Sequence, residues 1–157
     1  TGPFKNQGIV PVDENFGIVI PKIRANARVI AGVDWQDSRV YQQALVNGVA
    51  QAKGTANPGE PGNVFLFSHS GVDFFEANRY NALFYLIDKL VSGDEIIILY
   101  QGEKFTYQVT EKKIVSAESV EYLRGDGSKQ TLTLMTCWPA GTTLKRLIVT
   151  ALQVDPR

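Results

Sequence analysis

The sequence predicts a mainly β protein: a closed or nearly closed barrel of about eight strands, with two or three short helices covering it. Three observations support this fold class. Short apolar segments recur along the chain, Gly- and Pro-containing turns separate them, and the clearest segment alternates apolar and polar residues. A length of 157 residues suits one domain with a full core, and no repeat or domain boundary is visible. We therefore expect residues 1–157 to form a single domain.

The first third of the chain predicts strands around one helix. Segments 16–20 and 23–31 are rich in β-branched residues, and a proline between them indicates a bend. Within residues 37–52 the apolar positions have helical spacing, and Asp and Ser at the start supply a polar cap. Residues 54–62 contain two prolines and are expected to be a loop. The apolar run that follows, residues 63–68, predicts a central strand.

The remainder of the chain predicts one more helix and then mostly strands. Asp73 and Glu76 form a capping pattern for a helix that reaches Leu90. A helical turn is expected within residues 116–124, followed by a loop at 125–128. Four further strands are expected, at residues 95–100, 105–109, 131–137 and 146–152.

Composition excludes several classes of function. Lys plus Arg and Asp plus Glu are equal at 16 each, and no basic stripe is visible, so nucleic acid is not an expected partner. No stretch approaches the ~18 apolar residues that a membrane span needs. The single cysteine cannot form an internal disulfide, which leaves it as a candidate reactive thiol.

Cys137 is the strongest candidate for a catalytic residue. Side chains alternate along a strand, so Cys137 shares a face with Met135, while Leu134 and Thr136 point to the other face. The strand should end at the cysteine because Pro139 cannot continue a ladder. A thiol in that position is rigidly held yet opens onto a loop, which suits a nucleophile. The alternative is a small buried apolar side chain.

His69 and Arg146 supply the other groups that a cysteine nucleophile needs. His69 is the only histidine and directly follows a predicted strand, where it could carry protons or be an ordinary surface residue. A hairpin of the last two strands would bring Arg146 beside Cys137. Its guanidinium keeps its charge and could hold a developing oxyanion. The alternative is a cation at a strand edge, as the neighbouring Lys145 suggests.

Three neighbouring residues are candidates for substrate binding: Thr136, Trp138 and Ser70. The hydroxyl of Thr136 could touch a substrate, or its methyl group could pack, and packing is the favoured interpretation. Trp138 could equally form the wall of a groove or anchor the following loop. Ser70 is a candidate because it follows His69 directly.

Five short segments form a pattern that spans most of the chain. They are Gly-Ile-Val-Ile-Pro-Lys-Ile at 17–23, Pro-Gly-Glu-Pro-Gly-Asn at 58–63, Gly-Asp at 93–94, Thr-Leu-Thr-Leu-Met-Thr-Cys at 131–137 with Pro139, and Arg-Leu-Ile-Val at 146–149. These segments resemble blocks of the sortases, cysteine transpeptidases that attach proteins to bacterial cell walls. They occur in the family's order and cover roughly residues 17–152.

The resemblance implies a specific reaction. Cys137 would attack a Leu-Pro-X-Thr-Gly-like sorting signal, His69 would protonate the leaving amine, and Arg146 would steady the oxyanion or the substrate backbone. An amine of a cell-wall precursor or a pilin lysine would then release the acyl group. The resemblance also implies a place on the outer face of the bacterial membrane, through an N-terminal anchor that we expect to be missing from this sequence, which begins at Thr1 without Met.

Two departures from the family pattern concern the histidine and the N-terminus. Sortases commonly have Gly-His-Arg around the histidine, whereas this chain has Ser68-His69-Ser70. Residues 1–15 also lack the Asp-Pro-aromatic lid motif of pilus-building sortases. No cofactor is expected, although some sortases bind calcium through loop carboxylates. The carboxylates available here are Glu60, Glu118, Glu121 and Asp126.

Two alternatives to a sortase-type transpeptidase stay open, and a third is disfavoured. A cysteine hydrolase, or thiol protease, would share the first half-reaction and pass the acyl group to water. A binding module would carry Cys137 and His69 without using them. An L,D-transpeptidase places its histidine and cysteine within one short segment, and their wide separation here argues against that family.

Overall fold

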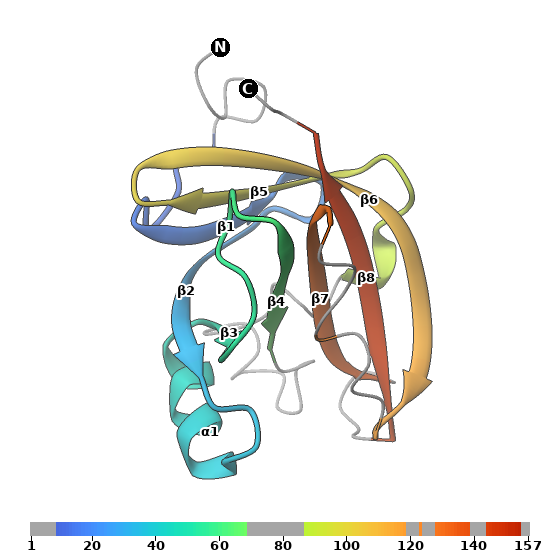
Figure 1. Cartoon of the computed structure of the whole chain (residues 1–157). Coiled ribbons are helices and arrows are strands. Elements are labelled where there is room, and N and C mark those ends of the chain that lie inside the picture. The colour runs from blue at the N-terminus through green and yellow to red at the C-terminus, as the bar shows by residue number, and fades with distance from the viewer. Residues whose placement is uncertain (1–8, 69–86, 119–122, 124–127, 139–143, 155–157) are drawn as a thin grey trace.

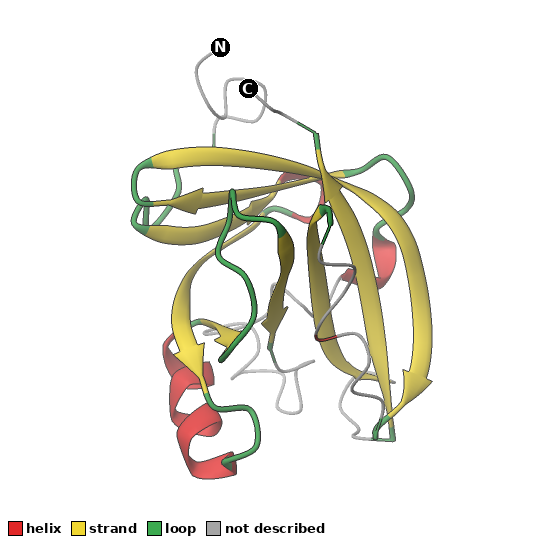
Figure 2. Ribbon diagram, viewed as in Figure 1, coloured by secondary structure: helices red, strands yellow, loops and turns green. Residues whose placement is uncertain are grey.

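Eight strands form a closed barrel in the computed structural model, which describes residues 9–68, 87–118, 123, 128–138 and 144–154 (Figure 1). Their order around the barrel is β1-β2-β3-β4-β7-β8-β6-β5. The bounds are β1 Phe16–Ile20, β2 Ala25–Val33, β3 Val49–Ala52, β4 Gly62–Phe67, β5 Glu95–Tyr100, β6 Glu103–Ser116, β7 Gln130–Trp138 and β8 Lys145–Gln153. The predicted mainly β barrel is confirmed, and Figure 2 shows how strands dominate these described parts.

The helix α1, Ser38–Asn47, confirms the predicted start but ends earlier than expected. Asp37 caps it, and its side chain accepts a hydrogen bond from the Arg39 N–H at 3.1 Å. The prediction of helix through residue 52 is wrong, because Val49–Ala52 form β3. The chain turns at Gly48, where a Cβ would lie 2.5 Å from the Arg28 carbonyl oxygen. Only glycine permits so close an approach of α1 to β2.

Strand β6 is longer than predicted. It runs to Ser116, because residues beyond Val109 pair along their length with β8. Exposed Glu111, Lys112 and Lys113 obscure the strand pattern in the sequence. The predicted helical turn at 116–124 is therefore wrong at its first residue, and most of that segment lies outside the described residues. Gln101 and Gly102 have φ values of 52° and 82°, which give the two-residue loop between β5 and β6 the left-handed turn that hairpins favour.

The remaining helical elements are short. Pro21–Ile23 form a 3₁₀ turn between β1 and β2, at the bend that Pro21 predicts. Most of the predicted helix at 73–90 lies outside the described residues. Its last part supplies two fully buried side chains, Ile87 and Leu90, to the core. Across the described segments, we find no helix with the length and apolarity to span a membrane.

The walls of the barrel have an inner and an outer apolar face. Leu132 and Leu134 of β7 belong to the interior core, together with Val64 of β4. Met135 packs instead against the outer cluster that includes Phe65 and Phe67. Side chains therefore alternate along β7 as the sequence predicts. Where β1 meets β5, the rings of Phe16 and Tyr100 pack edge to face with centroids 5.0 Å apart.

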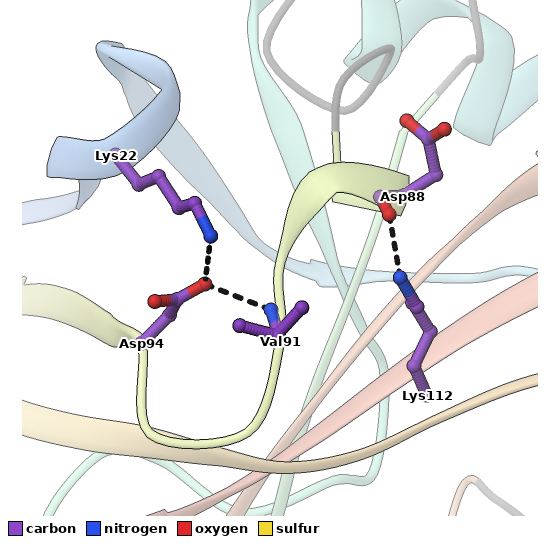
Figure 3. Close-up of polar contacts among 5 residues, drawn as sticks. All are labelled: Lys22, Asp88, Val91, Asp94 and Lys112. Atoms are coloured by element: carbon purple, nitrogen blue, oxygen red, sulfur yellow. Dashed lines mark hydrogen bonds and ion pairs between the residues drawn. The ribbon is translucent and has the colours of Figure 1, made fainter.

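A partly buried carboxylate ties the turn before β5 to the 3₁₀ turn (Figure 3). Oδ2 of Asp94 accepts hydrogen bonds from the Val91 N–H at 2.8 Å and from Lys22 Nζ at 2.9 Å. Nearby, Lys112 Nζ donates to the Asp88 carbonyl at 2.6 Å. Burial alone would raise the pKa of Asp94. The two hydrogen bonds and the charges of Lys22 and Lys112 outweigh burial and hold that pKa below its ordinary value.

We expect Asp94→Ala to lower the free energy of unfolding by about 1–2 kcal/mol, because a backbone N–H loses its charged acceptor. Lys22→Ala should cost about 0.5 kcal/mol, as for an exposed ion pair. The stabilising contribution of the Asp94 carboxylate is fully present at neutral pH. It is lost as the pH falls below the ordinary aspartate pKa of ~3.9 and through the lowered folded-state pKa. Urea unfolding at pH 7 and pH 3 measures both effects. Glu95→Ala, a change at the exposed neighbouring residue, serves as the control. An equal loss of unfolding free energy in Asp94→Ala at both pH values would contradict the prediction.

Candidate active site

Cys137 and Arg146 lie directly opposite each other where β7 and β8 approach their common end. The antiparallel register pairs these two residues, and both side chains are half-buried. Opposed residues in an antiparallel pair project from the same face, with Cβ atoms ~4.5–5.5 Å apart. The predicted hairpin is therefore confirmed, and a guanidinium group and the only thiol of the chain share one face of the barrel wall.

The backbone holds Arg146 at the strand start, and its side chain makes polar contacts. Nη1 donates to the carbonyl of the preceding Lys145 at 3.1 Å. Arginine keeps its charge at any working pH and presents five N–H donors in a planar fork, a geometry that suits a substrate oxygen. The pair can therefore supply a sulfur nucleophile and a cationic donor set to one reacting carbonyl.

His69 and Ser70 lie outside the described residues. The strand that precedes them is described as far as Ser68, whose N–H donates to the carbonyl of Met135 at 3.2 Å. This hydrogen bond continues the parallel β4–β7 ladder, in which Phe67 pairs with Met135. The chain that leads to His69 therefore runs beside β7, just before Cys137.

Thr136 and Trp138 both sit on the opposite face of β7 from Cys137. Thr136 is 2% exposed and pairs with Leu147 of the interior core. Trp138 is partly buried and packs against the same interior core. The side chains of Thr136 and Trp138 therefore lie on the inner face of β7, whereas the side chain of Cys137 lies on its outer face.

Asn63 is a polar centre that sequence reasoning missed. Its Oδ1 accepts hydrogen bonds from the hydroxyls of Thr131 and Thr133, each at 2.9 Å, and its Nδ2 donates to the Leu123 carbonyl at 3.2 Å. It is 3% exposed, and it joins β4, β7 and the segment that links β6 to β7. The sequence signal that could have identified Asn63 is an amide side chain at the first position of a predicted buried strand, because a buried amide needs hydrogen-bond partners.

A cavity of about 660 Å³ opens beside Asn63 on the outer face of this wall. Its lining includes the apolar residues Trp35 and Leu123 and the two charged residues Lys53 and Glu60. Asn63 pairs with Thr131, whereas the thiol is on Cys137, so the cavity and the thiol lie at opposite ends of the same strand.

Among the described residues, no group of three or more His, Cys, Asp or Glu side chains that could hold a metal ion is found. Glu60 accepts a hydrogen bond from the Asn57 N–H at 3.2 Å, and Glu118 is exposed. Glu121 and Asp126 lie outside the described residues.

A thiol held opposite a guanidinium on one face of a barrel wall is an arrangement that acyl-transfer chemistry can use. The Sortase domain model matches residues 18–154. The chain is a member of the sortase family, as that match across most of its length shows.

Individual relatives agree with the family match. The chain is 29% identical to Sortase D of Bacillus subtilis over 133 residues, which cover 83% of this chain but only 59% of that protein. A sortase D5 transpeptidase of Clostridium perfringens superimposes with a TM-score of 0.73 and 28% identity, over 94% of this chain and 82% of that one. A sortase C of the same organism, solved with the C-terminal cell wall sorting motif, has a TM-score of 0.74 and 30% identity over 89% and 70% of the two chains.

Proposed function

We propose that this chain is the catalytic domain of a cysteine transpeptidase that cleaves a Leu-Pro-X-Thr-Gly-like sorting signal and transfers it to an amine. The observation that carries the proposal is the opposition of Cys137 and Arg146 on one face of β7 and β8. Membership of the sortase family supports the same reaction class.

In the first half-reaction, the Cys137 thiolate attacks the carbonyl carbon of the Thr in the signal, the carbon of the Thr–Gly peptide bond. The oxygen becomes an oxyanion, which Arg146 stabilises through its N–H donors. The C–N bond breaks as His69 donates a proton to the leaving amine, and a thioester remains on Cys137. In the second half-reaction, an acceptor amine attacks the thioester and gives its proton to His69, which restores the thiolate.

The outer face of the β4–β7 wall has the length for an extended peptide. Six positions of β7 separate Thr131, next to the cavity, from Cys137. At ~3.3 Å per residue this distance is about 20 Å, which an extended peptide of about six residues would span. A relative with this fold was solved with the C-terminal cell wall sorting motif, which supports a sorting signal as the substrate.

The acceptor amine would come from a peptidoglycan precursor or from a pilin lysine. The protein would work at the extracellular face of the bacterial membrane, held there by an N-terminal anchor. No nucleic acid takes part, since the chain carries 16 basic and 16 acidic residues with no basic stripe.

Incubation with a small library of Leu-Pro-X-Thr-Gly-like peptides plus triglycine tests the proposal. We expect mass spectrometry to show the cleaved peptide joined to triglycine. Release of the free acid alone, with triglycine present, would identify a cysteine peptidase instead. Intact peptides throughout the library would favour a non-catalytic binding module.

A further inference from the structure

Two buried hydroxyl groups at the end of the β4–β7 wall lack hydrogen-bond partners within the described residues. They are Oγ of Ser68 and Oγ1 of Thr136. Ser68 is 5% exposed and Thr136 is 2% exposed, so bulk water does not reach them freely. A buried hydroxyl that makes no hydrogen bond costs free energy, and native proteins seldom leave one unsatisfied.

The two hydroxyls come from neighbouring positions. The Ser68 N–H donates a hydrogen bond to the Met135 carbonyl. In a parallel ladder this bond makes Ser68 the partner of Thr136, one position beyond the Phe67–Met135 pair. Side-chain alternation places both residues on the inner face, with Leu66 and Leu134 preceding them there. Strands lie ~4.8 Å apart, and no direct hydrogen bond joins the two hydroxyls, so the spacing suits one bridging molecule.

We propose that Ser68 and Thr136 are positioning residues whose hydroxyls bind one internal water molecule between β4 and β7. A water molecule suits the site because it can donate to and accept from both hydroxyls, and buried waters typically join otherwise unsatisfied polar groups. Trp138 follows Thr136 on the inner face and packs against the core, so the next inward-facing residue of β7 is also partly buried.

The positions of Ser68 and Thr136 in the sequence suggest how the water bridge affects catalysis. Ser68 directly precedes His69, and Thr136 directly precedes Cys137. The bridge therefore clamps the two strands at the last positions before the proposed proton carrier and the nucleophile. Its effect is to fix the separation of imidazole and thiol, on which the reactivity of the thiol depends. This inference rests on the proposed function, because it assumes that His69 and Cys137 act together.

The test measures how fast iodoacetamide alkylates Cys137 in the folded protein. The variants are Ser68→Ala, Thr136→Val, their combination, and Thr136→Ser, which keeps a hydroxyl. Iodoacetamide is not a peptide, so it does not report a substrate contact of Thr136. Thr110→Val is the matched control, since it removes an exposed hydroxyl that shares a hydrogen bond with Thr150 on the outer surface.

Each single variant that lacks a hydroxyl should slow alkylation by about three- to tenfold, the range for one neutral hydrogen bond. The double variant should be no slower than the slower single variant, because either change already breaks the bridge. Thr136→Ser should react nearly as fast as the wild type, and Thr110→Val should match it. For the peptide reaction, kcat should fall with the alkylation rate while KM changes little.

Three results would overturn the inference: wild-type alkylation in Ser68→Ala, effects that multiply in the double variant, or a loss of thermal stability without slower alkylation. If Ser68→Ala fails to fold, Thr136→Val, which removes the other hydroxyl and keeps the β-branched shape of threonine, gives the same comparison. The wild type separates this inference from the proposed function. If it forms a thioester with a sorting peptide but the variants behave normally, only the water bridge is wrong. If it forms none, the proposed function itself fails.

Discussion

Replacing Cys137 with alanine is expected to abolish the acyl-enzyme and to lower the rate of peptide transfer by about 10⁴-fold or more, the order seen when a covalent nucleophile is removed. Cys137 is the only thiol in the chain, so a thioester forms there or nowhere. Intact-mass measurement with a substrate analogue should show one adduct on the wild type and none on the variant.

The fold should survive this substitution, since the thiol is half-buried at a strand end and alanine fits the same backbone. A matching thermal unfolding curve would establish this, with Thr110→Val as a control that keeps full activity. An adduct on the alanine variant would contradict the assignment of Cys137 as the nucleophile and would require another nucleophilic side chain.

Arg146→Ala is expected to lower kcat by about 10²–10³-fold, the usual cost of removing an oxyanion donor. The peptide KM should change little, because the guanidinium interacts most strongly with the charge that develops in the transition state. Arg146→Lys keeps the charge but loses the planar fork of donors, so it should restore only part of the rate. Steady-state kinetics on the best peptide of the library measures all three values.

The matched control is Lys145→Ala, which removes the adjacent exposed cation and keeps the carbonyl that Arg146 contacts. It should leave kcat within about twofold of the wild type, as for most surface substitutions. Near-normal turnover in both Arg146 variants would show that this arginine is an ordinary strand-edge cation. Backbone N–H groups would then be the candidates for stabilising the oxyanion.

Much of the barrel could be predicted because local sequence specifies it. The apolar segments that became β1, β4, β5, β7 and β8 have strand length and clear ends. The opposition of Cys137 and Arg146 followed from a single assumption, a hairpin whose first strand stops near Pro139. The alternation of Met135 and Thr136 between faces followed from the geometry of any strand.

The features that the sequence did not predict share one cause: each depends on residues far away along the chain. Val49–Ala52 have helical spacing with the residues before them, but pairing with β2 and β4 makes them a strand. The charged part of β6 is a strand because β8 supplies its hydrogen bonds. Asn63 satisfies its polar atoms with Thr131 and Thr133, residues far along the chain. Tertiary partners override local preference in each case.

The strand order divides the barrel into two halves that are each continuous in sequence. Strands β1 to β4 form one half, and β5, β6, β8 and β7 form the other. The halves meet along two seams, the antiparallel β1–β5 pair and the parallel β4–β7 pair. Cys137 and Arg146 belong to the second half, whereas the strand that leads to His69 belongs to the first. The proposed nucleophile and the proposed proton carrier would therefore come together only when the β4–β7 seam closes. On the proposed mechanism, parting of this one seam would end catalysis while the hairpins of both halves persist.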